Sequence, residues 1–395
     1  MALKNNTWKL NQWYDQDVAG NVSYSTTSNE AWIWGNNQHG QLAQNTNNNA
    51  YSSPVQIPGT NWARIGIRNT HVAGVKTDGT LWMWGLNEKG QLGQSNKTQY
   101  SSPVQVPGTT WSSDWGKLNG TGYGVTGAVK TDGTLWIWGY NAKGQLGQNN
   151  TTDYSSPKQV PGTTWNIYSN SYEGCYSIRT DGTLWSWGRN NNATNTGKLG
   201  HNNQTRYSSP KQIPGTTWAT ICAAGGFMMA SKTDGTLWAW GSNAYGSLGM
   251  DNPDVNNLRY SSPVQVGTDT TWSTSYNQLC TNPSHTVAAI KTDGSLWTWG
   301  QNQHGELGQN NNTQYLSPKQ VGSGTDWDAV QTRHPCMIAR KTDGTVWVWG
   351  ENEKGSLGQN NQTHYSSPVQ VPGFTAGEFS SIGVNKDGFN VLKEL

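Results

Sequence analysis

Pairs of tryptophans separated by a single residue recur along the chain in the pattern Trp-x-Trp-Gly. Successive residues of a β-strand point to opposite faces of the sheet, so the two tryptophans of a pair share one face. A fixed period of this kind indicates a repeat architecture rather than several unrelated domains. The seven copies, spaced 49 to 59 residues apart, begin at Trp32, Trp82, Trp136, Trp185, Trp238, Trp297 and Trp347.

A hairpin turn is predicted immediately before most of these pairs. Six of the seven pairs follow Thr-Asp-Gly-[Thr/Ser]-[Leu/Val], as in Thr77–Leu81. An Asp-Gly pair between two strand-like runs is a strong signal for a type I′ turn, which needs positive φ at both central residues. The first copy departs from the pattern, because Ser28-Asn29-Glu30 replaces the Asp-Gly turn.

Two further motifs complete each repeat. A loop of the form Asn-x-x-Gly-x-Leu-Gly follows each pair, as in Asn87–Gly93, and its leucine is expected to fill the gap between neighbouring repeats. A run of the form Tyr-[Ser/Leu]-Ser-Pro-x-Gln-[Val/Ile] comes next, as in Tyr100–Val106. Its proline suits an edge strand, which needs no partner for the missing N–H. One more tryptophan, such as Trp111, then opens the next strand.

Four short strands in each repeat, without helical periodicity, predict the blades of a β-propeller. An open solenoid is the alternative. Ring closure is favoured because it removes the free strand edges that an open stack would expose.

Together these motifs resemble the repeat of the regulator of chromosome condensation family, over nearly the whole chain. The resemblance implies an all-β fold, a seven-bladed β-propeller with four-stranded blades in which strands from the N- and C-termini close the ring. Uncharacterised bacterial and phage proteins share this repeat. The founding members of the family act as exchange factors for a small nuclear GTPase and bind chromatin.

We therefore expect one propeller domain over residues 1–395. The segment 374–395 is expected to be a degenerate closing hairpin around Asp387-Gly388, and the alternatives are an eighth blade or a tail docked elsewhere. The expected repeats are residues 8–61, 62–110, 111–164, 165–217, 218–271, 272–326 and 327–373.

The 23 tryptophans follow the same scheme. Seven pairs and seven strand-opening residues, with Trp8 as the first opener, leave only Trp13 and Trp115 outside the repeat positions. Packing is therefore favoured over sugar-binding platforms for nearly all of them, since each can bury about 150–250 Å².

Composition and charge exclude several classes of partner. The chain has 26 basic and 24 acidic residues and no run of Lys or Arg, whereas a nucleic-acid-binding protein needs a basic stripe or arm. Residues Met1–Leu10 lack the apolar core of a secretory signal peptide. No apolar stretch approaches the roughly 18–20 residues of a membrane helix, so we expect no membrane insertion.

The sequence predicts no catalytic, metal-binding or cofactor-binding residues, and no cofactor is expected. Cys175, Cys222, Cys280 and Cys336 lack metal-ligand spacing, and inert buried thiols are favoured over disulfides. His39 and His304 share one loop position and are interpreted as exposed turn residues. The remaining histidines form no ligand pair.

The segments that break the repeat are the candidate contact sites, because inserted loops of repeat proteins often lie on the binding face. Tolerated surface insertions are the alternative, and a weak calcium site at Asp251 and Asp254 is another. The candidate partner-contact residues are Asn190, Asn195 and Lys198 in one loop, Asp251, Asp254 and Asn256 in another, and Lys117 and Asn119 in an irregular stretch.

The first hypothesis for function is a non-catalytic protein-interaction or structural and adhesive propeller, such as a decoration or tail component of a phage particle. Its partners would be other virion proteins or a host surface, and it would lie in the virion or outside the cell after lysis, with the cytoplasm as the alternative. A second hypothesis is an intracellular regulator resembling a guanine-nucleotide exchange factor. Family repeats often place a histidine seven residues before the Asp-Gly aspartate, as His71 precedes Asp78, but Phe227 takes that place before Asp234. A third is a lectin-like glycan binder that uses Trp13 or Trp115.

Overall fold

The structure, a computed structural model, describes 28 strands and two short 3-10 helices. The described residues are 29–35, 37–47, 51–68, 70–114, 116–121, 124–171, 173–190, 197–254, 258–333, 335–353, 356–359, 361–371, 379–385 and 388–393.

These strands form seven antiparallel four-stranded sheets. From the innermost strand outward, the first two sheets are β27 (Phe379–Asn385), β28 (Gly388–Lys393), β1 (Glu30–Gly35), β2 (Tyr51–Gln56), and β3 (Trp62–Arg68), β4 (His71–Lys76), β5 (Leu81–Gly85), β6 (Tyr100–Gln105). The third and fourth are β7 (Leu118–Thr121), β8 (Val125–Val129), β9 (Leu135–Gly139), β10 (Tyr154–Gln159), and β11 (Trp165–Ser171), β12 (Gly174–Arg179), β13 (Leu184–Gly188), β14 (Tyr207–Ile213). The fifth is β15 (Trp218–Ala223), β16 (Phe227–Lys232), β17 (Leu237–Ser242), β18 (Arg259–Gln265), and the sixth is β19 (Leu279–Thr281), β20 (Thr286–Ile290), β21 (Leu296–Gly300), β22 (Tyr315–Gln320). The seventh is β23 (Trp327–Arg333), β24 (Cys336–Lys341), β25 (Val346–Gly350), β26 (Tyr365–Gln370), and the 3-10 helices are η1 (Ala244–Gly246) and η2 (Tyr276–Gln278).

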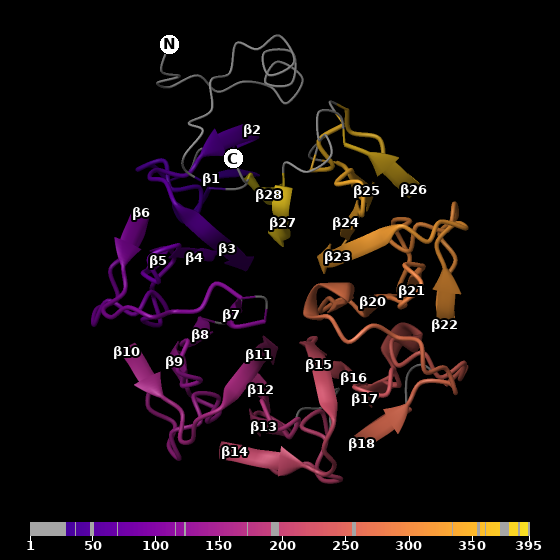
Figure 1. Cartoon of the computed structure of the whole chain (residues 1–395), viewed down its shortest axis with the longest axis horizontal. Coiled ribbons are helices and arrows are strands. Elements are labelled where there is room, and N and C mark those ends of the chain that lie inside the picture. Colours follow the sequence, from indigo (N-terminus) through magenta and orange to yellow (C-terminus); the bar gives the residue numbers. More distant parts are fainter. Residues whose placement is uncertain are drawn as a thin grey trace.

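The sheets stand radially around a central axis, with β3, β11, β15 and β23 near the axis and strands such as β6, β14 and β22 at the rim (Figure 1). Each innermost strand contacts the innermost strand of the next sheet, and β27 contacts both β23 and β3. The contacts therefore run around the whole ring, and the prediction of an all-β propeller is confirmed.

One sheet joins the two ends of the described chain. Strand β1 pairs with β28, with Trp32 opposite Val391, and β27 and β28 form its two inner strands. The C-terminal hairpin thus lies beside the N-terminal strands, as the closing-hairpin hypothesis requires. Trp8, the expected opener of this repeat, lies outside the described residues.

The Asp-Gly turns differ in type from the prediction. In the turn of the second sheet only Gly79 has positive φ (+76°), and Lys76 and Thr80 pair around a three-residue loop. A left-handed glycine closing a three-residue hairpin loop is the geometry observed, so the type I′ prediction is wrong. Asp78 stabilises the turn, because its Oδ1 accepts bonds from the backbone N–H (2.9 Å) and hydroxyl (2.6 Å) of Thr80.

A tryptophan N–H links each described loop of the Asn-x-x-Gly-x-Leu-Gly type to the next sheet. In the loop after β5, Leu92 is fully buried and Asn87 Oδ1 accepts its backbone N–H. The carbonyl oxygen of Gln91 accepts the Nε1–H of Trp138, the second tryptophan of the following sheet, at 2.8 Å. Five equivalent bonds of 2.7–3.0 Å donate from Trp84, Trp187, Trp240, Trp299 and Trp349. We call this contact the inter-blade clasp.

The strand-opening tryptophan completes the packing inside each sheet. Trp111 is 2% exposed and meets Trp136 and Trp138 edge to face, with ring centroids 6.4 and 6.0 Å apart. The ammonium of Lys130 lies 4.8 and 4.9 Å from the rings of Trp111 and Trp136, a favourable cation–π arrangement. The cations that repeat this contact are Lys76, Arg179, Lys232, Lys291 and Lys341. The packing interpretation of the repeat tryptophans is confirmed.

The backbone at Gly116 and the side chain of Tyr276, which belong to different parts of the ring, lie close to each other. Strands β7 and β19 are only four and three residues long, and irregular segments containing Gly116 and helix η2 precede them. A Cβ added at Gly116 would lie 3.0 Å from the ring of Tyr276, although two other sheets separate them along the ring. Figure 1 shows both segments reaching toward the centre.

We predict that replacing a clasp tryptophan destabilises the fold more than replacing its partner in the same pair. Trp138→Phe removes the bond to Gln91, whose carbonyl oxygen then keeps only the bond from Thr126 Oγ1, and leaves a gap where the larger ring packed, at an expected cost of about 2–4 kcal/mol. Trp136→Phe removes only a bond to Thr134 within its own hairpin and should cost less. Urea unfolding of both variants tests this, and equal losses would contradict it.

Candidate interaction face

The two faces of the ring differ in what they carry. Strands alternate in direction, so the turns between first and second strands share one face with the loops between third and fourth strands. This face, which we call the loop face, includes residues 86–99, 140–153 and 243–254. The opposite face, the turn face, holds the Asp-Gly turns and the linkers that lead to each opening tryptophan.

Two of the predicted contact residues on the loop face are buried. Asn190 has no exposed surface, and its side chain donates to the carbonyl oxygens of Asn203 (2.9 Å) and Thr205 (3.0 Å). Lys198 is 2% exposed, and its carbonyl oxygen accepts the clasp bond from Trp240. Both residues hold the loop in place, and their side chains are not available for contact with a partner.

Burial also changes the electrostatics of Lys198. Desolvation lowers its pKa to about 8, opposed by the negative charge of Glu173. Glu173 itself pairs with Arg189 at 2.5 Å. The inserted loop is thus anchored at its base by a buried charged group beside an ion pair.

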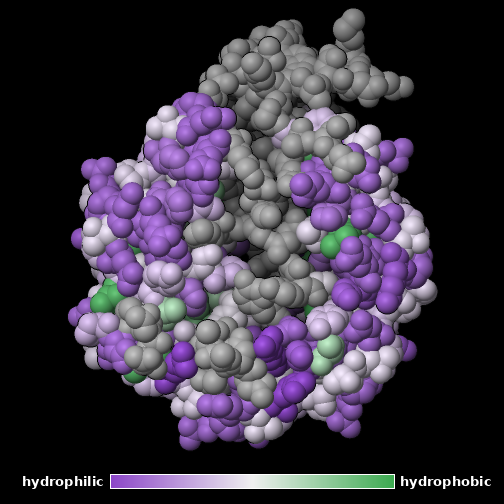
Figure 2. Space-filling view, turned by 180° about the vertical axis from the view of Figure 1, so that it is seen from behind, coloured by the Kyte–Doolittle hydropathy of each residue, from purple (hydrophilic) through white to green (hydrophobic). Residues whose placement is uncertain are grey.

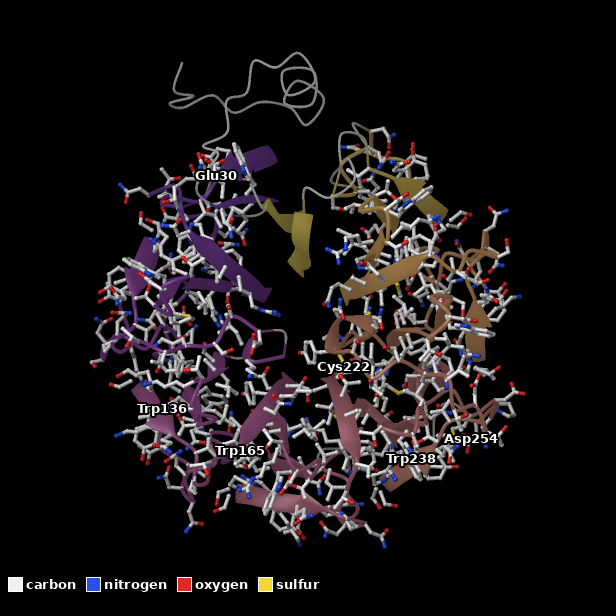
Figure 3. All side chains as sticks on the ribbon, viewed as in Figure 1. Glu30, Trp136, Trp165, Cys222, Trp238 and Asp254 are labelled. Carbon is white, nitrogen blue, oxygen red and sulfur yellow. The ribbon has the colours of Figure 1, made fainter. Side chains whose placement is uncertain are left out.

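The remaining predicted residues fall into three sets. Asp251 and Asp254 are exposed, and Figure 3 places Asp254 toward the rim, far from Cys222 beside the axis. Lys117 is partly buried and pairs with Asp114 at 2.8 Å. Asn195 and Asn256 lie outside the described residues, as does the side chain of Asn119.

Metal ligands and reactive thiols do not gather here. Among the described residues, no three His, Cys, Asp or Glu side chains lie close enough together to hold a metal ion, which leaves the calcium alternative without support. The four cysteines are free thiols, and three of them are buried.

Tyr245, in the same loop as Asp251, has an unusual environment. Its side chain is 39% exposed, more than any other large hydrophobic side chain in the described part of the chain. Its backbone has a positive φ of +57°, which is uncommon for a residue with a side chain. Its ring lies 5.6 Å from that of His285, which in turn stacks on Phe227 at 5.6 Å.

His285 adds a second strained position to this cluster, with φ of +71°. Burial lowers its pKa to about 4, so the imidazole is neutral at physiological pH. Strained backbone at non-glycine residues concentrates at functional sites, because surrounding contacts must hold it in place. Phe227, His285 and Tyr245 come from three loop-face segments of the fifth and sixth sheets, and we call them the aromatic cluster.

The rest of the visible surface is polar. Figure 2 shows hydrophilic side chains over most of one face, with hydrophobic residues only scattered among them. Neither 3-10 helix of the described chain is long and apolar enough to cross a membrane.

A family model for the regulator of chromosome condensation (RCC1) repeat matches residues 78–112, 132–166, 181–230, 234–275, 293–332 and 343–384, more than half of the chain. The chain belongs to the RCC1 repeat family. The ultraviolet-B receptor UVR8 of Arabidopsis thaliana is 26% identical over 303 residues, which cover 73% of this chain and 64% of the receptor. The human E3 ubiquitin-protein ligase HERC2 is 27% identical over 52% of this chain and 4% of its own length. The chain therefore spans less than two thirds of the length of these relatives.

Two solved structures share the fold of this RCC1 repeat protein. Prp20p from Saccharomyces cerevisiae superposes with a TM-score of 0.73 at 17% identity, covering 96% of this chain and 94% of Prp20p. Human WBSCR16 superposes with a TM-score of 0.74 at 18% identity, covering 93% and 99%. At these identities the likeness establishes the fold alone.

Sequence reasoning missed the aromatic cluster, although a signal was present. The third residue of the Asn-x-x-Gly loop is His39, Lys89, Lys143, His304 or Lys354 in other RCC1 repeats of this chain, and only at position 245 is it a tyrosine. The expectation that His39 and His304 are exposed is also too simple. Both are partly buried, and His304 Nδ1 lies 3.9 Å from Glu351 of the next sheet.

We predict that acid weakens the fold through the buried histidines. His71 is 2% exposed, its Nε2 lies 3.1 Å from Thr126 Oγ1, and burial lowers its pKa from 6.5 to about 4. Between these values the unfolded chain binds a proton that the folded chain does not, so stability falls as pH falls through this window. The contribution of His71 between pH 7 and pH 5 is about 2 kcal/mol.

Urea unfolding at the two pH values checks this, with His71→Gln as the comparison. The variant should lose less stability on acidification than the wild type. The loss that remains in the variant comes in part from His201 and His285, whose pKa values are also lowered by burial. An unchanged pH dependence in the variant would contradict the assignment.

Proposed function

We propose that this chain is a non-catalytic, seven-bladed protein-binding propeller of the regulatory kind, whose protein partner docks on the loop face at Tyr245. Family membership supports the class of function. Among solved structures with this fold, Prp20p is reported to bind Gsp1p and histones. In another, yeast RCC1 is bound to Kap60. Gsp1p, histones and Kap60 are all protein partners of those propellers.

The exposure of Tyr245 is the observation that carries the proposal. Tyrosine is enriched among the residues that dominate protein interfaces, because it combines a large apolar surface with a polar tip. Its ring is held against His285, so little conformational freedom is lost when a partner covers it.

Two exposed carboxylates follow Tyr245 in the same loop. Asp251 and Asp254 follow in the same loop and are exposed, and the backbone N–H of Asp251 bonds to the carbonyl oxygen of Leu316 in the next sheet at 3.0 Å. A hydrophobic centre with a charged edge fits a protein partner better than a nucleic acid, which would meet two carboxylates here.

The other functional hypotheses rank lower. The relatives named above come from a plant, a yeast and humans, so they offer no support for a phage-particle component, and the cellular location stays a prediction. Trp13 and Trp115, the tryptophans of the glycan hypothesis, lie outside the described residues. An exchange factor is also a protein-binding propeller, and this chain would act as one if its partner were a GTPase.

Site-specific photo-crosslinking tests the proposal. A benzophenone amino acid at position 245 should capture a protein partner from cells that express the full chain. The same probe at Lys143, at the equivalent loop position of another blade, and at Thr109 on the turn face should capture it less or not at all. Tyr245→Lys introduces the residue found at the equivalent positions Lys89 and Lys143. This variant should bind the purified partner about tenfold more weakly, or worse.

Lys143→Ala is the matched control and should bind within about twofold of the wild type. Equal affinity of Tyr245→Lys and the wild type, or crosslinks from the turn face alone, would overturn the proposal. If the captured protein is a small GTPase, acceleration of nucleotide release distinguishes a regulator from a passive scaffold.

A further inference from the structure

The loop after β17, which carries Tyr245, packs on the outer strand of the sixth sheet, at the rim between β18 and β22 (Figure 1). A Cβ added at Gly246 would lie 2.8 Å from the Cα of Leu316, so the loop backbone touches β22 directly. The equivalent glycine of five other loops would meet a serine Cα at 2.6–2.7 Å in the same way. These serines are Ser101, Ser155, Ser208, Ser261 and Ser366.

Four residues at this contact depart from the repeat, and we call them the Tyr245 junction. Tyr245 takes the place of a lysine or a histidine of equivalent loops, and Met250 takes that of a glutamine or a histidine. Leu316 stands where the six other copies have serine, and Asp251 stands where they have asparagine or serine. One contact between two sheets has thus gained apolar surface and a negative charge together.

The four residues lie close together. The backbone N–H of Asp251 donates to the carbonyl oxygen of Leu316 at 3.0 Å, and Gly246, next to Tyr245, touches the same leucine. Tyr245 and Asp251 are exposed, and Met250 and Leu316 are half-buried. Apolar surface and a carboxylate therefore reach solvent on either side of one leucine.

The carboxylate of Asp251 is not bonded within the described part of the protein. At the equivalent positions, the side-chain oxygens of Asn149 and Asn310 accept a serine hydroxyl of the next sheet at 3.3 and 3.4 Å. The side chain of Asp251 makes no such bond, and it makes no ion pair with a residue that the structure describes. Lys319 of β22 is held elsewhere, because its Nζ donates to the hydroxyl oxygen of Tyr315 at 3.2 Å. The charge of Asp251 is therefore available to a partner.

A peptide segment with an apolar side chain beside a positive one matches this surface. Its apolar group packs on the ring of Tyr245 and on Leu316, and the face of the ring also attracts a cation. An acidic segment is disfavoured, because it would meet the carboxylates of Asp251 and of Asp254 in the same loop.

Resting on the docking at Tyr245 proposed above, we propose that the Tyr245 junction binds a short basic segment of the protein partner. An apolar side chain of that segment covers Tyr245 and Leu316, and a neighbouring lysine or arginine pairs with Asp251.

Selection from a displayed library of random short peptides tests this proposal. The library is panned on the full chain, and binders to the Tyr245→Lys variant are removed, so that only peptides that need Tyr245 remain. These peptides should carry a lysine or an arginine beside a leucine, isoleucine, methionine or phenylalanine. Peptides without basic residues, or an empty selection, would overturn the basic-segment proposal. The docking of a protein at Tyr245 is judged separately, by the crosslinks that position 245 forms with the natural partner.

Calorimetric titration of an enriched synthetic peptide separates the two contacts. Leu316→Ser restores the serine of the other copies and should weaken binding about fivefold or more, because apolar contact is lost. Asp251→Asn should weaken it about threefold to fivefold at low salt and by less at high salt. Asparagine is compatible with the φ of +51° at this position, since Asn149 and Asn310 have φ of +57° and +58°.

The double variant of Asp251→Asn and Asn149→Asp is the control for overall charge. It moves the carboxylate to the loop of the third sheet, where a lysine and a serine stand in place of the tyrosine and the leucine. This variant should bind the peptide as weakly as Asp251→Asn alone. Recovery of wild-type affinity in the double variant, or unchanged affinity in Asp251→Asn, would overturn the pairing with Asp251 and leave docking at Tyr245 intact.

Discussion

The inter-blade clasp is the contact on which the ring depends. Each of the six second tryptophans whose side chains are described packs its ring against the preceding sheet and donates Nε1–H to a loop carbonyl oxygen there, as Trp138 does to Gln91. A Cβ at Gly93 would lie 2.9 Å from Trp138 Nε1, so the glycine after the leucine eases the approach of the indole. The first copy has Ala43 at this position, and Trp84 still donates to Gln41 at 2.9 Å. Tryptophan thus supplies both the apolar area and the hydrogen bond that orders one sheet against the next. A chain with only 33% hydrophobic residues can close a propeller in this way.

The fold could be predicted from sequence because its signals are local and repeated. Trp-x-Trp-Gly fixes which face each strand buries, and the Asn-x-x-Gly-x-Leu-Gly loop places the leucine that packs between sheets. The turn type could not be read in the same way, because Asp78 and Thr80 form a side-chain bridge that stabilises a three-residue loop. The burial of Asn190 and Lys198 could not be predicted either. An inserted segment is expected to be exposed, even when the residues at its two ends are buried.

The proposed contact residue stands where one copy differs from the others. Tyr245 replaces a lysine or a histidine of equivalent loops. This change does not disturb the clasp, since Trp299 keeps its bond to Ser247. The repeated residues therefore hold the ring, and the exceptions are free to acquire contacts with partners or ligands. A single sequence does not separate such exceptions from neutral variation until the structure shows which of them are exposed or unsatisfied.

Hydrogen exchange of the indole N–H groups is the most direct test of this account. The clasp tryptophans Trp84, Trp138, Trp187, Trp240, Trp299 and Trp349 should exchange slowly and with one common free energy, that of unfolding the whole ring. The first tryptophans of the pairs, such as Trp82 and Trp136, bond only within their own hairpins and should exchange faster. Equal exchange in both sets, or clasp tryptophans that exchange independently sheet by sheet, would contradict the claim that the clasp holds the ring together.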